Sequence, residues 1–196
     1  MAKENIKSKV YGIGFLGNGK YSVGKDRAAY RTWSGILSRC YSEKTKERHK
    51  SYEGCIVCNE WLNFQNFAEF YYGNIRENGW QIDKDILCKN NKIYSPQTCL
   101  IVPSEINKLF VKRKRHRGDL PIGVHYESSR GRYKASLHDG SGKTKFLGRF
   151  HTAEEAFRAY KEAKEKIIRR KALEYHGVIS EKLFNALMNY QVEITD

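Results

Sequence analysis

The chain has 196 residues, a net charge of +14 and 40% hydrophobic residues, which suits one or two small packed domains. It has no apolar run of about 18 residues, and the start, Met1 to Asn5, does not resemble a signal peptide, so we expect a cytoplasmic protein. The positive charge favours a polyanion as partner, with nucleic acid as the leading candidate. A membrane surface is not expected, because the sequence has no basic amphipathic helix with a strongly apolar face, and no small-molecule substrate is expected.

The positive charge is concentrated in one part of the chain. Residues 111–150 hold 11 basic and 3 acidic side chains, so they contribute +8 of the net +14. Residues 151–196 hold 8 of each sign and are neutral overall. We therefore expect the main nucleic-acid contact within residues 111–150.

The N-terminal stretch is rich in glycine. Tyr11–Tyr21 lacks the spacing of a phosphate-binding P-loop, so we predict a β-hairpin that turns at Gly17-Asn18-Gly19. A helix is predicted over residues 26–41, with Asp26 as its N-cap. Its apolar stripe consists of Ala29, Trp33, Ile36, Leu37 and Cys40.

Short elements follow up to residue 110. The polar stretch 42–51 predicts a loop, and the apolar stretch 54–58 predicts a strand or a turn. Trp61–Tyr72 predicts an aromatic-rich helix. Residues 80–103 predict two short strands around a polar turn, followed by a short helix from Ser104 to Phe110.

The five cysteines are expected to be reduced, because the chain looks cytosolic and their number is odd. Cys55 and Cys58 form one Cys-x-x-Cys pair, which a further cysteine would complete into a zinc site. Structural zinc sites usually have a second close pair, and this chain has none. We therefore favour buried free thiols over zinc. The cysteines are Cys40, Cys55, Cys58, Cys88 and Cys99.

Five short motifs occur in order over residues 28–110. They are Tyr30-x-x-Trp33, Arg39-Cys40-Tyr41, Val57-Cys58-x-x-Trp61-x-x-Phe64, Ile82-Asp83-Lys84-Asp85 and Tyr94-Ser95-Pro96-x-x-Cys99. Their order and spacing resemble the small HNH endonucleases of phage homing elements, which have a ββα-metal fold. The resemblance implies metal-dependent DNA cleavage with Mg²⁺ or Mn²⁺ as cofactor, and a location in the host cytoplasm.

The expected catalytic residues depart from the pattern of that family. An HNH site uses a histidine to activate water and a metal ion to stabilise the leaving oxygen. Here the aspartate-histidine step of the family is Asp83-Lys84, and its later asparagine is Thr98. Residues 51–110 contain no histidine. A lysine is normally protonated at neutral pH and is then a poor base.

Three interpretations of this segment remain open. In the first, Asp83 and Asp85 bind Mg²⁺, while Lys84 or an outside residue such as His49 supports cleavage. In the second, the nuclease fold persists as a shell that binds DNA or a partner protein. In the third, residues 83–85 are a solvated turn.

A basic linker separates the two halves of the chain. Five of the six residues from Lys112 to Arg117 are Lys or Arg, and such a run is usually extended. On DNA we expect Arg113, Arg115 and Arg117 to contact phosphates without reading sequence. The alternative is a solvated tether.

The stretch from Pro121 to Arg170 predicts three strands followed by a helix. The strands are expected within residues 121–126, 131–138 and 145–150, separated by turns that contain glycine. Thr152 and Glu155 form a capping box at the start of the helix. The helix face that packs on the sheet is expected to consist of Ala156, Phe157, Tyr160, Ala163, Lys164 and Ile167.

The central strand predicts one apolar and one polar face. Alternation sends Tyr133, Ala135 and Leu137 towards the helix. The opposite face is basic and can form hydrogen bonds, and a DNA major groove is wide enough to admit such a sheet. The alternative interpretation is that this face is only solvated. The polar residues expected there are Lys134, Ser136 and His138, beside Arg130, Arg132 and Lys145.

A second resemblance covers this quarter of the chain. The pieces are Gly123-Val124, Arg132-Tyr133-Lys134-Ala135, Phe146-Leu147-Gly148-Arg149-Phe150 and Thr152-Ala153-Glu154-Glu155-Ala156. They resemble the Apetala-type DNA-binding domain of plant ethylene-response factors, which reads DNA with its sheet. The resemblance implies DNA contacts at His125, Ser136, His138 and Phe146. Most of the arginines of that family are missing here, so its target sequence is not carried over.

Taken together, the sequence predicts an α+β protein. We expect an HNH-like unit over residues 1–110, a linker over 111–119, and an Apetala-type domain over 120–196 that ends in a short helix after Ser180. The expected function is double-stranded DNA binding, with metal-dependent nicking or cleavage if Asp83, Lys84 and Asp85 are active. The alternative is an inactive HNH-like regulator or inhibitor that binds DNA or a host protein.

Overall fold

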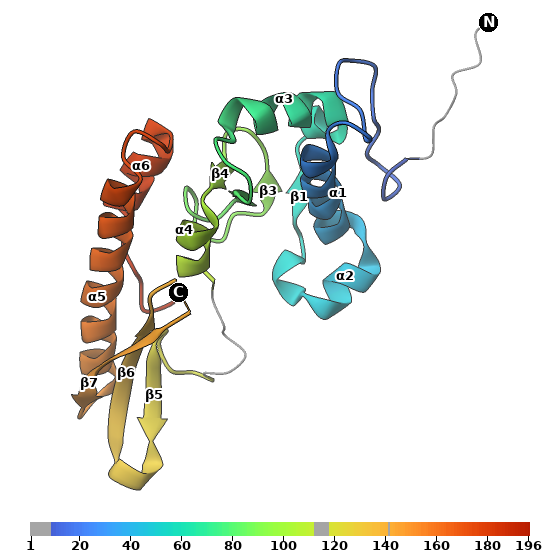
Figure 1. The fold of residues 1–196 in the computed structure, drawn as a ribbon. Helices are drawn as coiled ribbons and strands as arrows, with labels where there is room; N and C mark the ends of the chain where they lie inside the picture. The colour runs from blue at the N-terminus through green and yellow to red at the C-terminus, as the bar shows by residue number, and fades with distance from the viewer. Residues whose placement is uncertain (1–8, 112–117, 141) are drawn as a thin grey trace, which may run out of the picture. The chain divides into compact units, whose positions relative to one another are not determined.

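The computed structural model describes residues 9–111, 118–140 and 142–196. The chain forms two compact units, Met1–Ile101 and Val102–Asp196 (Figure 1). Each unit contains helices and strands, so the protein is α+β, as predicted. In the part of the chain that the structure describes, no helix has the length and apolar character needed to cross a membrane.

The first unit combines helices with very short strands. β1 pairs in parallel with β3, and β2 pairs with β4. Short 3-10 helices at Lys50–Tyr52 and Asn59–Leu62 lie before and after β1. The elements are α1 (Arg27–Tyr41), α2 (Glu43–Arg48), β1 (Ile56–Val57), α3 (Phe64–Asn74), β2 (Gln81–Asp83), β3 (Ile93–Tyr94) and β4 (Leu100–Val102).

The core of the first unit is aromatic. Trp33 of α1 is fully buried, and its Nε1 donates a hydrogen bond to the carbonyl of Trp61 at 2.7 Å. The ring centroids of Trp33 and Phe64 are 5.4 Å apart, and those of Trp61 and Phe67 are 5.1 Å apart. Aromatic pairs at these separations add to the free energy gained by burial. The predicted apolar stripe of α1 is buried throughout, which confirms that helix.

The loop predicted over residues 42–51 is wrong. Glu43–Arg48 forms α2, which buries none of its residues and therefore has no apolar period to reveal it. An ion pair between Lys46 and Glu43 at 2.9 Å supports the helix from outside. The hydroxyl groups of Ser38 and Thr45 also lie 2.9 Å apart and join α2 to α1.

The hairpin predicted at Gly17-Asn18-Gly19 is also wrong. The structure instead has a tight turn in which Val10 and Gly14 form an antiparallel bridge. Gly17 and Gly19 lie against the side chains of Asn63 and Gln65, where a Cβ atom would be closer than 2.5 Å to each neighbour. These glycines therefore allow a close approach to α3 and do not form a hairpin turn.

The helix predicted from Trp61 begins later, at Phe64. The side chain of Asn63 accepts a hydrogen bond from the backbone N–H of Gln65 and caps the helix. Trp61 precedes it in the 3-10 helix. At α1, Asp26 occupies the predicted N-cap position, but its carboxylate accepts a hydrogen bond from Ser22 and not from the helix.

The second unit consists of an antiparallel sheet with a long helix, as predicted. Within the described residues the sheet has three strands in the order β5-β6-β7. α5 begins with the predicted capping box of Thr152 and Glu155. The elements are α4 (Ser104–Leu109), β5 (Val124–Glu127), β6 (Arg132–His138), β7 (Thr144–Phe150), α5 (Ala153–Glu174) and α6 (Glu181–Met188).

α5 packs along one face of this sheet (Figure 1). Ala135 and Leu137 of β6 are buried on that face, as predicted, whereas Tyr133 is half-buried. Ala163 and Ile167 were expected in the buried face of the helix but are only half-buried. The face instead follows a four-residue period, a ridge typical of helix packing. Its buried residues are Ala156, Phe157, Tyr160, Lys164, Ile168 and Ala172.

α4 and the C-terminal segment pack on the same helix. Lys171 of α5 donates to Glu105 of α4 at 2.8 Å. The rings of Phe110 and Tyr190 meet edge to face at 4.8 Å. These contacts place α4 in the second unit, whose boundary lies before Val102.

Candidate functional site

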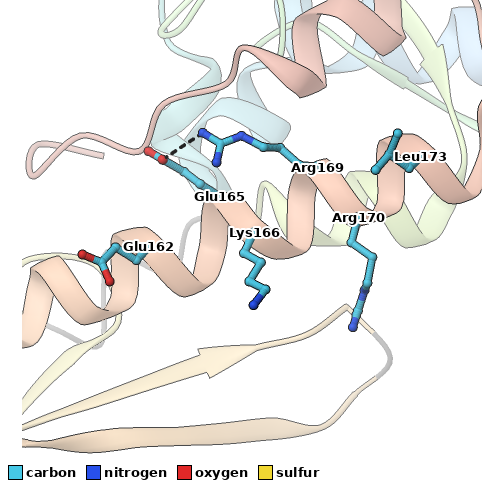
Figure 2. Close-up of a pocket in the computed structure, with 6 residues that line it drawn as sticks. All are labelled: Glu162, Glu165, Lys166, Arg169, Arg170 and Leu173. Atoms are coloured by element: carbon cyan, nitrogen blue, oxygen red, sulfur yellow. Dashed lines mark hydrogen bonds and ion pairs between the residues drawn. The ribbon is translucent and has the colours of Figure 1, made fainter.

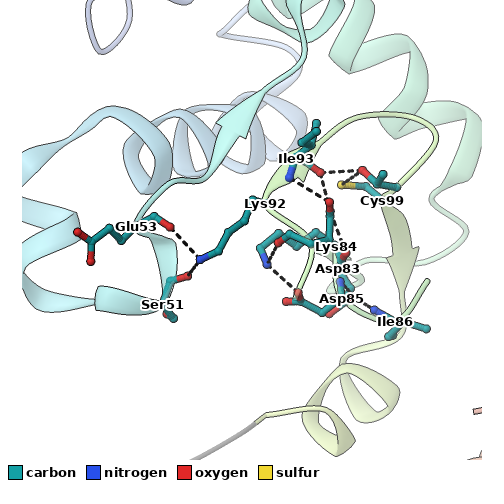
Figure 3. Close-up of polar contacts among 11 residues, drawn as sticks. Ser51, Glu53, Asp83, Lys84, Asp85, Ile86, Lys92, Ile93 and Cys99 are labelled. Atoms are coloured by element: carbon teal, nitrogen blue, oxygen red, sulfur yellow. Dashed lines mark hydrogen bonds and ion pairs between the residues drawn. The ribbon is translucent and has the colours of Figure 1, made fainter. Parts of the chain in front are cut away.

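The segment after β2 is a compact turn (Figure 3). Oδ1 of Asp83 accepts hydrogen bonds from the backbone N–H groups of Asp85 at 2.8 Å and Ile86 at 2.7 Å. Burial raises the pKa of Asp83, while these two N–H donors act in the opposite direction. One carboxylate oxygen of Asp83 is therefore already used to close the turn.

Lys84 fills the position where the HNH resemblance implies a histidine. Its side chain is only 10% exposed. Nζ donates to Oδ1 of Asp85 and to the carbonyl of Asn91, both at 2.7 Å. The Asn91 amide in turn donates to the carbonyls of Lys84 at 3.0 Å and Ile93 at 2.6 Å. Lys84 thus acts as a donor that ties the turn to the segment before β3.

This arrangement does not fit a divalent metal ion. A cation at Asp85 would compete with the Lys84 ammonium for the same carboxylate. Asp83 is half-buried, and one of its oxygens already accepts two backbone hydrogen bonds. Within residues 9–111, 118–140 and 142–196, no group of three or more His, Cys, Asp or Glu side chains is placed to hold a metal. His49 lies against the ring of Tyr52, with centroids 6.1 Å apart.

The cysteines of the first unit are free thiols. Cys40, Cys55 and Cys99 are buried. Burial raises the pKa of Cys40 and of Cys99 to about 12 each. The spacing of Cys55 and Cys58 is explained by β1, which lies between them.

The second candidate site is the face of the β5-β6-β7 sheet opposite α5, here called the outer face. Directly paired residues share a face, and His125 pairs with Lys134 while Glu127 pairs with Arg132. Because Ala135 points to α5, its neighbour Lys134 points outward. The outer face therefore contains His125, Glu127, Arg132, Lys134, Ser136, His138, Thr144, Phe146 and Arg149.

Within the outer face, Glu127 of β5 pairs with two cations, one from β6 and one from β7. Arg149 Nε donates to Glu127 Oε2 at 2.5 Å, and Lys134 Nζ lies 3.9 Å from Oε1. The hydrogen bond from Arg149 lowers the pKa of Glu127, so the carboxylate stays ionised. The Arg149 guanidinium also lies over the ring of Phe146, 5.0 Å from its centroid. Phe146 is 51% exposed.

Glu127 and Arg149 were not among the predicted site residues. Strict alternation from Phe146 would place Arg149, three residues on, on the helix side of the sheet. Its ion pair with Glu127 depends on the β-bulge between Ala135 and Ser136, which shifts the register of β7. No local pattern reveals that shift.

The other residues predicted to contact DNA do not take part in the cluster around Glu127. Lys145 pairs with Leu137, so its register position is on the helix side and not, as expected, on the outer face. Arg130 is exposed in the 3-10 turn before β6. His138 ends β6, and its Nδ1 accepts a hydrogen bond from the N–H of Gly140 at 3.2 Å. The linker contacts Arg113, Arg115 and Arg117 lie outside the described residues.

A shallow hollow on α5 is not a comparable site (Figure 2). All of its lining residues come from this one helix. Glu165 forms ion pairs with Lys161 at 2.8 Å and Arg169 at 3.3 Å. Single ion pairs of this kind on a helix surface are worth little.

The site that best combines exposure, positive charge and fixed geometry is the outer face of the sheet. Arg149 of β7 and Lys134 of β6 meet at the Glu127 carboxylate of β5, and the Phe146 ring of β7 lies under the Arg149 guanidinium. No family model matches the chain, and no curated protein or solved structure matches it either.

Proposed function

We propose that the chain binds double-stranded DNA through the outer face of the β5-β6-β7 sheet. The arrangement around Glu127 carries this proposal, because it presents the Arg149 guanidinium at a fixed position beside Lys134 and above the exposed Phe146 ring. A B-DNA major groove is wide enough for β-strands. The sheet and α5 also follow the element order that the Apetala-type resemblance implies.

Each group on the outer face has a role in such a complex. Glu127 accepts from Nε and Nη2 of Arg149, and the remaining N–H groups at Nη1 and Nη2 match the two acceptors of a guanine in the major groove. Lys134 and Arg132 are suited to phosphate oxygens, which orient the protein without reading sequence. The exposed Phe146 ring offers apolar contact to a thymine methyl group.

For the first unit, we propose an HNH-like shell that does not hydrolyse DNA. Lys84 supports this choice, because its ammonium donates two hydrogen bonds and is paired with one of the two carboxylates that the metal would need. The shell would contribute binding surface for DNA or a partner protein.

The test of DNA binding compares two triple variants of equal charge. The first is Arg132→Ala, Lys134→Ala and Arg149→Ala on the outer face. The second, its control, is Arg158→Ala, Lys166→Ala and Arg170→Ala, which removes three exposed cations from α5. Fluorescence anisotropy with duplexes selected from a random pool should show a loss of about tenfold or more for the first variant, since one good base contact is worth roughly 1–3 kcal/mol.

Two outcomes would contradict the proposal. Equal weakening of both variants would mean that only net charge matters. Equal binding of the matching RNA duplex would exclude the major-groove model, because the A-form major groove is too deep and narrow for a sheet. We expect the DNA duplex to bind more tightly than the RNA duplex.

A further inference from the structure

Residues 10–21 of the first unit form a loop, here called the aromatic loop. It is not part of the outer face, which belongs to the second unit. It opens with a tight turn in which Val10 and Gly14 exchange backbone hydrogen bonds of 2.7 and 3.0 Å. Tyr11 lies within this turn, and its side chain is 45% exposed. Phe15 follows the turn and is 47% exposed.

Tyr11 adopts a backbone conformation that is unfavourable for it. Its φ of 53° lies in the left-handed region, which bulky L-residues rarely occupy. The next residue, Gly12, has a φ of 77° and suits that region. A glycine at position 11 would therefore suit the turn better than tyrosine does. Strained residues that persist on a surface often mark functional positions.

The main chain that carries these rings is held by the core. A Cβ atom at Gly14 would lie 2.4 Å from Leu37 Cδ1 and 2.9 Å from Trp33 Cζ2, so the turn is pressed directly onto α1. The N–H of Phe15 donates to the carbonyl of Leu62, and its carbonyl accepts from the N–H of Phe64, both at 2.9 Å. The Phe15 backbone is thus fixed on both sides while its ring stays exposed.

The rest of the loop is clamped by one side chain. The Gln65 amide accepts from the N–H of Tyr21 at 3.0 Å and donates to the carbonyls of Leu16 at 3.0 Å and Tyr21 at 2.9 Å. These three half-buried hydrogen bonds restrict the loop. Exposed cations flank it in the sequence, at Lys9, Lys25 and Arg27.

We propose that the aromatic loop is a second nucleic-acid site, at which Tyr11 and Phe15 stack on unpaired bases. Proteins bind single strands with exposed aromatic rings and cations, because every base has a face that stacks. Here the carbonyl of Lys9 accepts from the N–H of Gly12 at 3.3 Å, so one cation belongs to the turn that carries Tyr11. A ring held on a fixed main chain loses little conformational entropy on binding. This site is independent of duplex binding by the outer face.

The test uses the full-length protein and an oligothymidylate of about 15 nucleotides with a central 2-aminopurine, a length that spans such sites. Base stacking quenches 2-aminopurine fluorescence, and anisotropy of an end label gives the affinity. We expect Tyr11→Gly and Phe15→Ala each to weaken binding by about 5- to 100-fold and to reduce the quenching. Tyr11→Gly should keep or raise the melting temperature, because glycine suits the positive φ.

Two further variants serve as controls. Tyr11→Phe keeps the ring and should bind like the wild type; a loss as large as that of Tyr11→Gly would mean a hydroxyl contact and overturn stacking. Tyr126→Ala removes another exposed tyrosine, from the second unit, and should change nothing. The proposal would be overturned if the wild type did not bind the single strand, or if all loop variants bound it as the wild type does. Either result would also be expected if the loop binds a protein instead.

The outer-face triple variant separates the two sites. It should lose affinity for the duplex, while the 2-aminopurine of the single strand should still be quenched on binding. If it abolishes single-strand binding while the loop variants do not, the aromatic-loop site is wrong and duplex binding by the outer face still stands.

Discussion

At the scale of single residues, burial decides what a charged side chain can do. Lys84 is largely buried and paired with Asp85, and such a pair holds local geometry more than it adds stability. Arg149 has a partner in Glu127 as well, but on an exposed sheet face. Its remaining N–H groups stay open to a ligand. Lys84 is therefore confined to a structural contact, whereas Arg149 is accessible to a partner.

Lys164 carries a charge that burial makes unfavourable in the folded chain. It lies in the buried face of α5 and lines a small pocket with Leu109, Tyr160 and Val192, whose other charged lining residue is Asp196. Burial lowers its pKa from 10.5 to about 8. At pH 7 the folded chain therefore holds a poorly solvated ammonium.

The pH dependence of stability follows from this shift. Below pH 8 both states are protonated, and the folded state bears the full penalty. Between about pH 8 and 10.5 the folded state releases the proton while the unfolded state keeps it, so stability rises with pH. Lys164→Met keeps the apolar stem and should stabilise the chain by about 3 kcal/mol at pH 7, with a smaller gain at pH 10.

Urea unfolding of the full chain at both pH values measures this effect. Lys166→Met, an exposed position on the same helix, is the control and should change little. A gain for Lys164→Met that is the same at both pH values would show that the ammonium is not the cause.

At the scale of elements, local signals identified those that also bury an apolar face. The capping box and apolar period predicted α5, and turn glycines with alternating residues predicted the strands of the second unit. α2 was missed because it buries no residue. The pairing of β1 with β3 was missed because two-residue strands have no alternation to detect.

Gly123, just before β5, packs against Tyr160 of α5 and provides a test of how the sheet and this helix fit together. Its φ is +79°, and a Cβ atom there would lie 2.0 Å from Cδ2 of Tyr160. Gly131 has a φ of +58° with nothing within 4 Å of that position. Gly131→Ala should therefore cost about 1 kcal/mol from backbone strain alone. Gly123→Ala should cost about 2–4 kcal/mol, because Tyr160 must also move.

Chemical unfolding of the two variants checks this difference. If both lose the same stability, the contact between Gly123 and Tyr160 does not constrain the packing of α5. Circular dichroism at low denaturant shows whether each variant is folded before the comparison is made.

At the scale of the whole molecule, the proposal assigns binding to both units and hydrolysis to neither. We expect purified full-length protein with Mg²⁺ or Mn²⁺ to leave supercoiled plasmid intact, like the Asp83→Ala, Asp85→Ala variant and a chelator control. The physical reason is that Lys84 shares the carboxylate that a metal would require. Metal-dependent nicking by the wild type that the variant loses would contradict the shell and establish a nuclease.

The sequence by itself determined the α+β class, the helix–sheet unit near the C-terminus and the concentration of positive charge, because composition, period and capping act within one segment. Only the tertiary structure decided that Lys84 pairs with Asp85 and Asn91, that a β-bulge brings Arg149 to Glu127, and that Tyr11 is held in a strained turn. These contacts depend on strand register and on burial. Both arise from residues far apart in the chain, so no local pattern contains them.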